Sequence, residues 1–331
     1  MKVLLADKLS ASTINKLEAL GCTVVSNPEL NAETLVEAIA DFEVLVVRST
    51  KVSAAVIAAS KALSLIIRAG AGVNTIDLEA ASQRGIHVTN CPGKNTEAVA
   101  ELAIGLMIAA DRRIPQAGAD LAQGAWKKGE YGKARGLKGR TLGVIGLGNI
   151  GHAVIARAQG LEMDVVAWSR SLTDEAAKAL GITRAASPLE VATQADVVSL
   201  HVAYSKSTTH HLVNAEFLAA MKKGAILINT ARGEVVDTAA LKVAIREKGL
   251  RVGLDVFEDE PKGSTDTFAD QELATLAICT PHIGASTDQA SEAIADETVR
   301  IVQTFIDTGM PANVVNVRLQ ATTTNGMVVR H

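Results

Sequence analysis

Short runs of apolar residues alternate along the chain with longer segments whose apolar positions recur at helical spacing. The first part of the chain holds four such runs, at residues 3–5, 22–25, 44–47 and 63–67. A second series follows at residues 141–145, 164–168, 196–200, 225–229 and 252–255. Continuous apolar runs are typical of parallel strands that helices cover on both faces. The pattern therefore predicts an α/β chain with two doubly wound parallel sheets.

Two long segments of helical periodicity separate these series. The first covers residues 96–114 and is closed by Pro115, and the second covers residues 285–308 and is closed by Gly309. Proline and glycine are typical of helix ends, because proline cannot continue the hydrogen-bond ladder and glycine tolerates a reversal of the chain. We expect these two helices to join the two lobes.

The end of the chain indicates how the lobes are divided. After the second long helix only residues 313–319 are strand-like, and they are too few for a further domain. We therefore expect this segment to return to the first lobe. The prediction is a discontinuous domain of residues 1–95 and 285–331, with a second domain of residues 96–284 inserted into it.

The charge balance narrows the class of partner. The 331 residues include 33 Lys and Arg against 36 Asp and Glu, which gives a net charge of −3. This balance gives no electrostatic footprint for nucleic acid or an anionic membrane, and no apolar segment reaches the roughly 18 residues of a membrane span. Asp7 interrupts the first apolar run too early for a signal peptide. We expect a cytoplasmic protein whose partner is a small molecule or another protein.

The metal-ligating residue types show no ligand spacing. Cys22, Cys91 and Cys279 are odd in number and form no C-x-x-C pair, so neither a disulfide framework nor a zinc site is predicted. Six histidines lack nearby acids or thiols at ligand spacing and are expected to be structural: His87, His152, His201, His210, His211 and His331.

The stretch GLGNIG at residues 146–151 places three glycines in a G-x-G-x-x-G spacing. The spacing alone is a weak signal, because glycine-rich turns are common. Here it stands between the predicted strand at residues 141–145 and an Ala-rich segment of helical period. In that context Gly146, Gly148 and Gly151 predict a turn whose backbone N–H groups and following helix N-terminus bind a dinucleotide pyrophosphate.

The end of the next predicted strand bears on the choice of dinucleotide. An Asp or Glu usually stands there to bind the adenosine ribose, but this chain has Ser169 followed by Arg170. The missing carboxylate and the available guanidinium suit the 2′-phosphate of NADP. Alternatively, Arg170 points to solvent and Ser169 simply makes no contact with the ribose. NAD and NADP both remain open.

Three polar stretches each follow an apolar strand of the second series and contribute one Arg, one Glu and one His. Ligands of open α/β sheets bind at the carboxyl ends of strands, so we expect Arg232, Glu260 and His282 to share the cleft between the lobes. They suit hydride transfer between a dinucleotide and a 2-hydroxy or 2-oxo acid. Arg232 clamps the carboxylate, His282 moves the hydroxyl proton and Glu260 orients the imidazole. Taken singly, each has a structural or solvated alternative.

The stretches GLGNIG, NTARGEVVD, LDVFEDEP and TPHIGAS, in this order, resemble the D-isomer-specific 2-hydroxyacid dehydrogenases, and the resemblance covers nearly the whole chain. It implies a Rossmann-type cofactor domain inserted in a flavodoxin-like substrate domain, with Arg232, Glu260 and His282 as the catalytic set. The residues expected to contact NAD or NADP are Gly146, Gly148, Asn149, Ile150, Gly151, Ser169, Arg170, Thr230, Ala231, Asp255 and Gly284.

Stretches of the first lobe, VRSTKV, RAGAGVN and NCPGKNT, are similar to the phosphoglycerate dehydrogenases of this family. They imply oxidation of 3-phosphoglycerate in serine synthesis. The residues expected to contact the substrate are Arg48, Ser49, Gly70, Ala71, Gly72, Val73 and Asn95. Arg48 and Ser49 would lie near the phosphorylated end, and Lys133 and Arg135 are further candidates for the phosphate.

Departures from the family pattern keep other functions open. Ser169 replaces the usual acid, and Asn74 stands where the phosphoglycerate enzymes usually have Asp. One alternative is a glyoxylate or hydroxypyruvate reductase that uses NADPH and needs no phosphate site. Another, of a different class, is a dinucleotide-sensing corepressor that binds protein partners.

The resemblance also implies how the chain assembles and what its last residues correspond to. We expect a homodimer, or a tetramer, through residues 96–124. Residues 322–331 resemble the first strand of the serine-sensing module found in longer relatives. Either the chain is a short form with a vestigial tail, or it is a piece of a longer protein.

Overall fold

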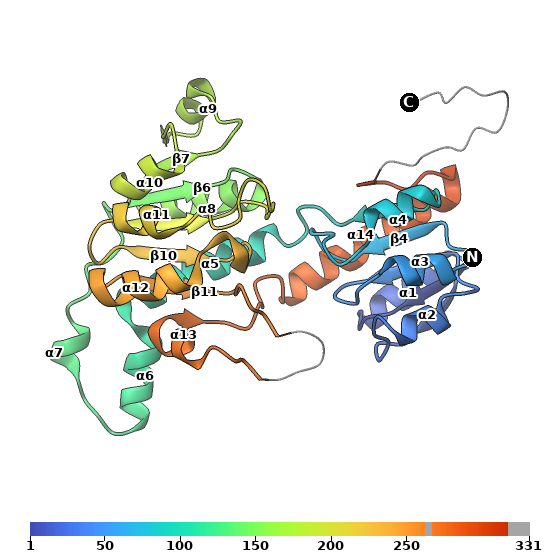
Figure 1. Cartoon of the computed structure of the whole chain (residues 1–331), viewed down its shortest axis with the longest axis horizontal. Helices are drawn as coiled ribbons and strands as arrows, with labels where there is room; N and C mark the ends of the chain where they lie inside the picture. Colours follow the sequence, from blue (N-terminus) through green and yellow to red (C-terminus); the bar gives the residue numbers. More distant parts are fainter. Residues whose placement is uncertain (262–266, 317–331) are drawn as a thin grey trace. The chain divides into compact units, whose positions relative to one another are not determined.

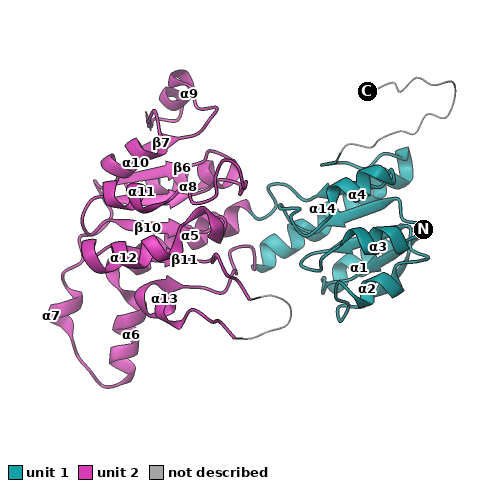
Figure 2. Cartoon of the chain, in the orientation of Figure 1, with its two compact units in different colours: residues 1–95, 287–331 teal, residues 96–286 magenta. Residues whose placement is uncertain are grey.

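The computed structural model describes residues 1–261 and 267–316. The chain divides into two compact units, one formed by residues 1–95 and the chain from residue 287 onward, the other by residues 96–286 (Figure 2). Each unit is built on its own parallel sheet with helices on both faces (Figure 1). The predicted fold class, two parallel-sheet α/β lobes, is therefore confirmed.

Unit 1 contains a five-stranded sheet in the order β2-β1-β3-β4-β5, which is the flavodoxin-like order. Its strands are β1 (Lys2–Leu5), β2 (Thr23–Ser26), β3 (Val44–Val47), β4 (Leu65–Arg68) and β5 (His87–Asn90). Its helices are α1 (Ala11–Ala19), α2 (Thr34–Ala38), α3 (Ala54–Ala59), α4 (Leu78–Gln83) and α14 (Asp288–Thr308).

Alternating side chains of these strands fill two apolar layers. In β1, Val3 and Leu5 belong to one layer and Leu4 to the other. The first layer is closed by α1 and α14, which contribute Leu17 and Ile301. Because both faces are covered, apolar residues at consecutive positions are all buried, as the continuous apolar runs predict.

Unit 2 contains a seven-stranded sheet in the order β12-β11-β10-β9-β6-β7-β8, the Rossmann order with one added strand. Its strands are β6 (Thr141–Ile145), β7 (Asp164–Trp168), β8 (Thr183–Arg184), β9 (Val197–Leu200), β10 (Ile226–Asn229), β11 (Arg251–Leu254) and β12 (Ile278–Cys279). One face is covered by α5 (Thr96–Arg112) and α8 (Asn149–Gly160). The other is covered by α10 (Pro188–Gln194), α11 (Ala215–Ala220) and α12 (Thr238–Lys248).

Shorter elements complete unit 2. They are α6 (Ile114–Ala122), α7 (Lys128–Tyr131), α9 (Asp174–Ala179), the 3-10 turn η1 (Gly233–Val235) and α13 (Gln271–Leu276). Helices α6 and α7 stand away from the sheet (Figure 1), and α6 has no buried residue. None of the described helices is long and apolar enough to cross a membrane.

Several predicted boundaries were wrong. The first long helix ends at Arg112, because Arg113 adopts a left-handed conformation with φ 51° and α6 starts at Ile114. The second starts at Asp288, where the Thr287 hydroxyl accepts a hydrogen bond from the Ala290 amide. Strands β5, β8 and β12 were not predicted, since β5 carries polar His87 and Thr89 and the other two have only two residues each.

The described chain end lies beside β5 of unit 1. Val314 forms an isolated antiparallel bridge with Thr89, and the Val315 amide donates to the Val88 carbonyl at 2.8 Å. Residues 313–316 thus return to unit 1, but as a single bridge and not as the expected strand. The rest of that predicted strand, 317–319, and the tail at 322–331 lie outside the described residues.

A buried ion pair joins the end of α5 to the start of β6. Arg140 Nη1 lies 2.9 Å from Asp111 Oδ1, and the other Asp111 oxygen accepts the Gly136 amide at 2.9 Å. Both side chains are almost completely buried. Removing one partner of such a pair leaves an uncompensated buried charge.

We predict that Asp111→Ala lowers the free energy of unfolding of unit 2 by about 3–5 kcal/mol, because Arg140 would stay buried without its partner. Urea unfolding followed by circular dichroism measures the change. Asp174→Ala, which breaks the exposed ion pair with Arg184, is the matched control and should change stability by less than about 1 kcal/mol. Equal effects of the two substitutions would contradict the prediction.

Candidate active site

The glycine turn lies between β6 and α8. A Cβ at Gly146, whose φ is 99°, would lie 2.5 Å from the His201 carbonyl oxygen, and one at Gly151 would lie 2.2 Å from the Gly146 carbonyl oxygen. A Cβ at Gly148 would instead meet nothing within 4 Å. Gly146 and Gly151 therefore allow close packing of the turn, and Gly148 leaves open space above it.

The helix end behind this turn is available to an anion. Helix α8 begins at Asn149 and Ile150, and its cap residue Gly148 provides no side-chain hydrogen bond. The N–H groups of a first helical turn lack intrahelical partners and favour a negative charge. The open space at Gly148 and this uncapped N-terminus fit the pyrophosphate of a dinucleotide.

A histidine lies against the same turn. His201 follows β9, and its Nε2 lies 2.8 Å from the Ser199 hydroxyl. Burial lowers the pKa of His201 to about 4. The ring is therefore neutral near pH 7 and adds no charge beside the expected pyrophosphate site.

The two residues directly after β7, Ser169 and Arg170, carry no carboxylate. Ser169 is half-buried and Arg170 is exposed. Arg170 forms no hydrogen bond or ion pair with the residues that the structure describes. Its guanidinium is thus free to meet a ligand at this strand end.

Glu260 and His282 meet at the carboxyl edge of the unit 2 sheet, one after β11 and the other after β12. His282 Nδ1 lies 2.9 Å from Glu260 Oε2, and the other Glu260 oxygen accepts the Phe257 amide at 3.2 Å. The His282 side chain is 48% exposed and the Glu260 side chain 34% exposed. In the described part of the chain, Nε2 of His282 has no partner, so the ring is oriented by the carboxylate and presents its other nitrogen to solvent.

Several interactions keep the Glu260 carboxylate charged. Burial raises its pKa, but the hydrogen bond and charge of His282, the Phe257 amide and the nearby charge of Arg232 together outweigh burial and lower the pKa below the usual value for Glu. Because the charge of Arg232 contributes to this lowering of the Glu260 pKa, the two side chains interact electrostatically.

Arg232 lies on a turn that packs against the Glu260 loop. The Asn229 side chain donates to the Arg232 carbonyl at 2.8 Å and accepts the Ala231 amide at 3.0 Å. A Cβ at Gly233 would lie 1.8 Å from the Phe257 carbonyl carbon. Only glycine permits this approach, which places the turn directly against the segment that carries Glu260.

Asp255 organises the loop that carries His282. Its buried carboxylate accepts the Thr280 hydroxyl at 2.6 Å and the amides of Ile283 and Gly284, both at 2.8 Å. His282 itself adopts φ 52°, a conformation that non-glycine residues rarely adopt. Asp255 was predicted only as a cofactor contact, and the sequence signal for this further role is an acid directly after a buried strand.

A second observation fits a bound cofactor. The Thr230 hydroxyl, at the end of β10, is buried without a hydrogen-bond partner among the described residues. A buried hydroxyl of this kind costs free energy unless a ligand or water pairs with it. Thr230, Ala231, Asp255 and Gly284 all lie at the edge of the sheet that carries Arg232, Glu260 and His282.

A cavity of about 510 Å³ adjoins the pair of Glu260 and His282. Phe257, Phe268, Cys279 and Thr280 are among the residues that line it. Burial raises the pKa of the Cys279 thiol to about 11, so this cysteine stays protonated and is no nucleophile near neutral pH.

In unit 1 the predicted substrate residues lie at the carboxyl edge of its own sheet. Arg48 and Ser49 follow β3, and a carboxylate oxygen of Asp7 accepts the amides of Arg48, Ser49 and Thr50 at 2.6, 3.1 and 3.1 Å. The sequence analysis missed Asp7. Its signal was an acid at the end of the first apolar run.

The glycine turn after β4 is held by its neighbours. The Asn90 side chain donates to the Ala71 carbonyl at 2.6 Å, and the Cys91 amide donates to the Gly70 carbonyl at 2.9 Å. The guanidinium of Arg68 lies so close to Gly70 that a Cβ there would fall 1.7 Å from its Nη1. Arg68 is a second strand-end arginine that the sequence analysis did not single out. The remaining predicted contacts of this region, Gly72, Val73 and Asn95, are half-buried.

Of the two further phosphate candidates in unit 2, Arg135 has a partner in the same unit. Its Nη1 lies 3.0 Å from Asp196 Oδ1. Lys133 is exposed. Neither lies in the loops that carry Arg232, Glu260 and His282.

Comparison with known proteins identifies the family. Residues 104–284 match the model of the D-isomer specific 2-hydroxyacid dehydrogenase, NAD binding domain. A D-3-phosphoglycerate dehydrogenase of Methanocaldococcus jannaschii is 41% identical over 320 residues, which are 96% of this chain and 59% of that protein. The chain thus spans less than two thirds of that relative's length.

Two further relatives match over most of their length. A hydroxypyruvate reductase of Thermotoga maritima is 41% identical over 281 residues, which cover 83% of this chain and 88% of the relative. The crystal structure of the TT0316 protein from Thermus thermophilus is 35% identical, with a TM-score of 0.85, and the match covers 95% of this chain and all of that one.

We predict that His282→Ala raises the pKa of the Glu260 carboxyl, because the lowering hydrogen bond and charge are lost while burial remains. Carbon-13 NMR titration of labelled Glu side chains, with Glu260→Gln for assignment, measures the shift.

The direction of the Glu260 pKa shift also determines how the free energy of unfolding depends on pH. A carboxyl whose pKa is depressed by folding stabilises the fold above the unfolded value and loses this contribution as pH falls. The stability difference between wild type and His282→Ala should therefore shrink below about pH 4.5, the ordinary value for Glu. An unchanged or lower Glu260 pKa in the variant would contradict the assignment.

Proposed function

The chain belongs to the D-isomer specific 2-hydroxyacid dehydrogenase family, and from this premise we propose that it is a D-3-phosphoglycerate dehydrogenase. The reaction is the reversible oxidation of 3-phosphoglycerate to phosphohydroxypyruvate, which would feed serine synthesis. The observation that carries the substrate assignment is the cationic Arg48 beside Ser49 at a strand end of unit 1. The similarity to the D-3-phosphoglycerate dehydrogenase of Methanocaldococcus jannaschii supports this assignment.

Three residues of unit 2 perform the proton and binding chemistry in this proposal. Arg232 binds the substrate carboxylate through paired N–H donors. In the oxidation, Nε2 of His282 accepts the hydroxyl proton, and in the reduction it returns that proton to the forming hydroxyl. Glu260 accepts the hydrogen bond of Nδ1 and stabilises the resulting imidazolium. The glycine turn, Asn149, Ile150 and Thr230 would hold the nicotinamide dinucleotide, which supplies the hydride acceptor.

Asp7 defines how a phosphate would be recognised in unit 1. Three successive amides at Arg48, Ser49 and Thr50 form a concave group of N–H donors suited to an anion. The Asp7 carboxylate already occupies them. The substrate phosphate would therefore be bound by side chains, chiefly the guanidinium of Arg48 and the hydroxyl of Ser49, and not by these amides.

A second candidate function has its own support. Ser169 and Arg170, which has no partner among the described residues, suit the 2′-phosphate of NADP. A hydroxypyruvate reductase is also as similar in identity as the phosphoglycerate enzyme. In this alternative the chain is an NADPH-dependent glyoxylate or hydroxypyruvate reductase. Arg48 would then have no phosphate to bind.

We also propose that the chain forms a homodimer through the segment that contains α6. The apolar side chains of Ile114, Leu121 and Trp126 are 53%, 55% and 78% exposed. Exposed apolar side chains gathered in one segment mark interaction sites. Pairing with the same segment of a second copy would remove them from water.

We predict that phosphohydroxypyruvate is reduced with a higher kcat/KM than hydroxypyruvate or glyoxylate, and that Arg48→Ala lowers kcat/KM for the phosphorylated substrate at least tenfold while leaving that for hydroxypyruvate within about twofold. Loss of a charge-assisted hydrogen bond worth about 1.5–3 kcal/mol gives this magnitude. Nicotinamide absorbance with NADH and NADPH measures all rates. Lys61→Ala, at an exposed lysine elsewhere in unit 1, is the control.

The outcomes separate the functions. Equal or better use of hydroxypyruvate by the wild type, with NADPH preferred, would overturn the phosphoglycerate assignment in favour of the reductase. Tight dinucleotide binding without turnover of any of these acids would favour a cofactor-sensing protein.

We predict that Leu121→Glu converts the dimer to a monomer, since a buried unpaired carboxylate in the interface costs several kcal/mol. Light scattering after size-exclusion chromatography measures the mass. Glu130→Gln, at an exposed position of α7, should leave the dimer intact. A wild-type monomer at micromolar concentration would refute the proposed interface.

A further inference from the structure

Unit 2 contains a second pair of a histidine and a carboxylate, next to the pair of Glu260 and His282. His211 Nε2 lies 2.5 Å from Glu258 Oε1. Glu258 is two residues before Glu260, and His211 lies between β9 and α11. The chemistry proposed for the site uses neither residue, and the sequence predicts only a structural role for His211.

The Glu258 carboxylate joins three segments that follow different strands. Its second oxygen accepts the amide of Thr238, the first residue of α12, at 3.2 Å. Helix α12 follows the turn that carries Arg232. The carboxylate therefore connects the segment of Glu260, the segment after Arg232 and the segment of His211.

The backbone around His211 reinforces this connection. The His211 amide donates to the Glu234 carbonyl at 2.9 Å, and Val213 forms a parallel bridge with Val236. The His211 segment thus runs beside the end of the Arg232 turn. On the other side of that turn, Gly233 touches the backbone of Phe257 and Glu258.

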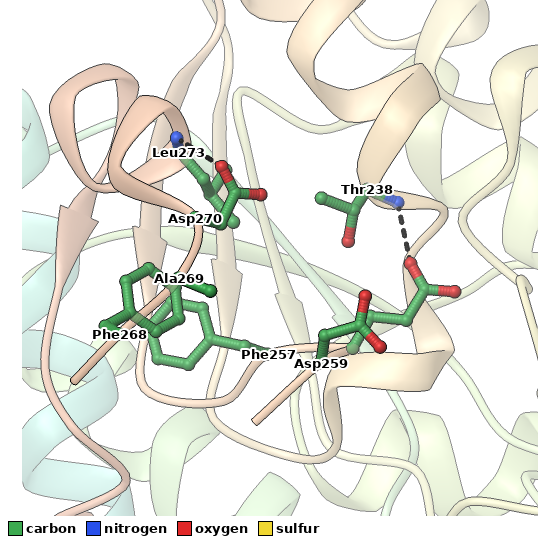
Figure 3. Close-up of a pocket in the computed structure, with 8 residues that line it drawn as sticks. Thr238, Phe257, Asp259, Phe268, Ala269, Asp270 and Leu273 are labelled. Atoms are coloured by element: carbon green, nitrogen blue, oxygen red, sulfur yellow. Dashed lines mark hydrogen bonds between the residues drawn. The ribbon is translucent and has the colours of Figure 1, made fainter. Parts of the chain in front are cut away.

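The Glu258 segment packs against the Arg232 turn at Gly233 and also borders open space. A cavity of about 310 Å³ adjoins it, lined by Thr238, Phe257, Asp259, Phe268 and Asp270 among others (Figure 3). The contact at Gly233 holds the backbone of this segment, and the hydrogen bonds of Glu258 add the side-chain contacts that limit its movement where it borders the cavity.

We propose that His211 and Glu258 form a positioning pair that sets the distance between Arg232 and Glu260, and through it the orientation of the substrate carboxylate relative to His282. Neither residue touches the reacting atoms. The proposal depends on the oxidoreductase activity of the family and not on which 2-oxo acid the chain reduces.

The pair has features that an incidental surface ion pair lacks. His211 holds a left-handed backbone conformation with φ 48°, and its ring stacks on that of His210 at a centroid distance of 4.0 Å. Burial raises the pKa of Glu258, but the hydrogen bonds from His211 and Thr238 outweigh burial and lower it. The carboxylate is thus charged near neutral pH, and both partners are restricted in position.

The test compares Glu258→Ala, His211→Ala and the double variant in the full chain, with whichever 2-oxo acid the wild type reduces fastest. We expect each single variant to lower kcat about tenfold and to raise KM for the oxo acid, while the dissociation constant of the nicotinamide cofactor stays within about twofold. The double variant should also lose about tenfold and not a hundredfold, because residues that act as a unit are not additive.

Two further variants separate positioning from stability. His211→Gln keeps a nitrogen donor near the position of Nε2 and should recover most of the lost kcat. Lys242→Gln removes the 2.8 Å ion pair between Lys242 of α12 and Asp270, which is comparably buried. This variant should lower the melting temperature without lowering kcat.

Three outcomes would overturn the proposal: wild-type kcat in both alanine variants, a kcat loss in Lys242→Gln equal to theirs, or no recovery in His211→Gln. If Glu258→Ala does not fold, Glu258→Gln serves in its place, since its amide oxygen can still accept from Thr238 while the charge is lost. Failure of the phosphoglycerate assignment alters only the substrate used, so the two results stay distinguishable.

Discussion

The parallel direction of all strands is the constraint on which the arrangement of this chain depends. Because every strand of a sheet ends at the same edge, residues far apart in sequence become neighbours there. Arg232, Glu260 and His282 follow β10, β11 and β12, three adjacent strands. The glycine turn follows β6 at the same edge. Unit 1 repeats the arrangement with the loops after β1, β3 and β4.

Carboxylates at the strand ends, of which Asp255 is buried and the others half-buried, hold these loops in shape by accepting backbone N–H groups. Asp255 binds two amides and a hydroxyl of the His282 loop, Asp7 binds three amides of the Arg48 turn, and Glu260 binds the Phe257 amide as well as His282. A charged acceptor forms stronger hydrogen bonds than a neutral one. The loops are therefore ordered by internal anions before any substrate arrives, which reduces the ordering cost of binding.

The sequence predicts this fold well where a local signal exists. The buried strands are continuous apolar runs, and the glycine spacing, the order of motifs and the residues that follow each strand point to one edge of a Rossmann sheet. The missed features have a weak local signal or none. Strand β5 alternates polar and apolar residues, β12 has two residues, and the roles of Asp7, Asp255 and Glu258 depend on partners 20 to 47 positions away in the chain. Burial and pairing across loops are properties of the folded chain, so pattern alone does not contain them.

The division of unit 1 has a consequence for how the protein is made. Helix α14 closes one face of the unit 1 sheet together with α1, yet residues 91–287, which include all of unit 2, lie between it and β5. At ribosomal speeds this interval lasts roughly 10–40 s. During that time Val3, Leu5 and Ile67 have no covering helix from α14, so the nascent first lobe exposes an apolar sheet face while unit 2 folds as a complete domain. Aggregation during synthesis is therefore a hazard specific to the first lobe, and chaperones that bind extended apolar segments would act on it first.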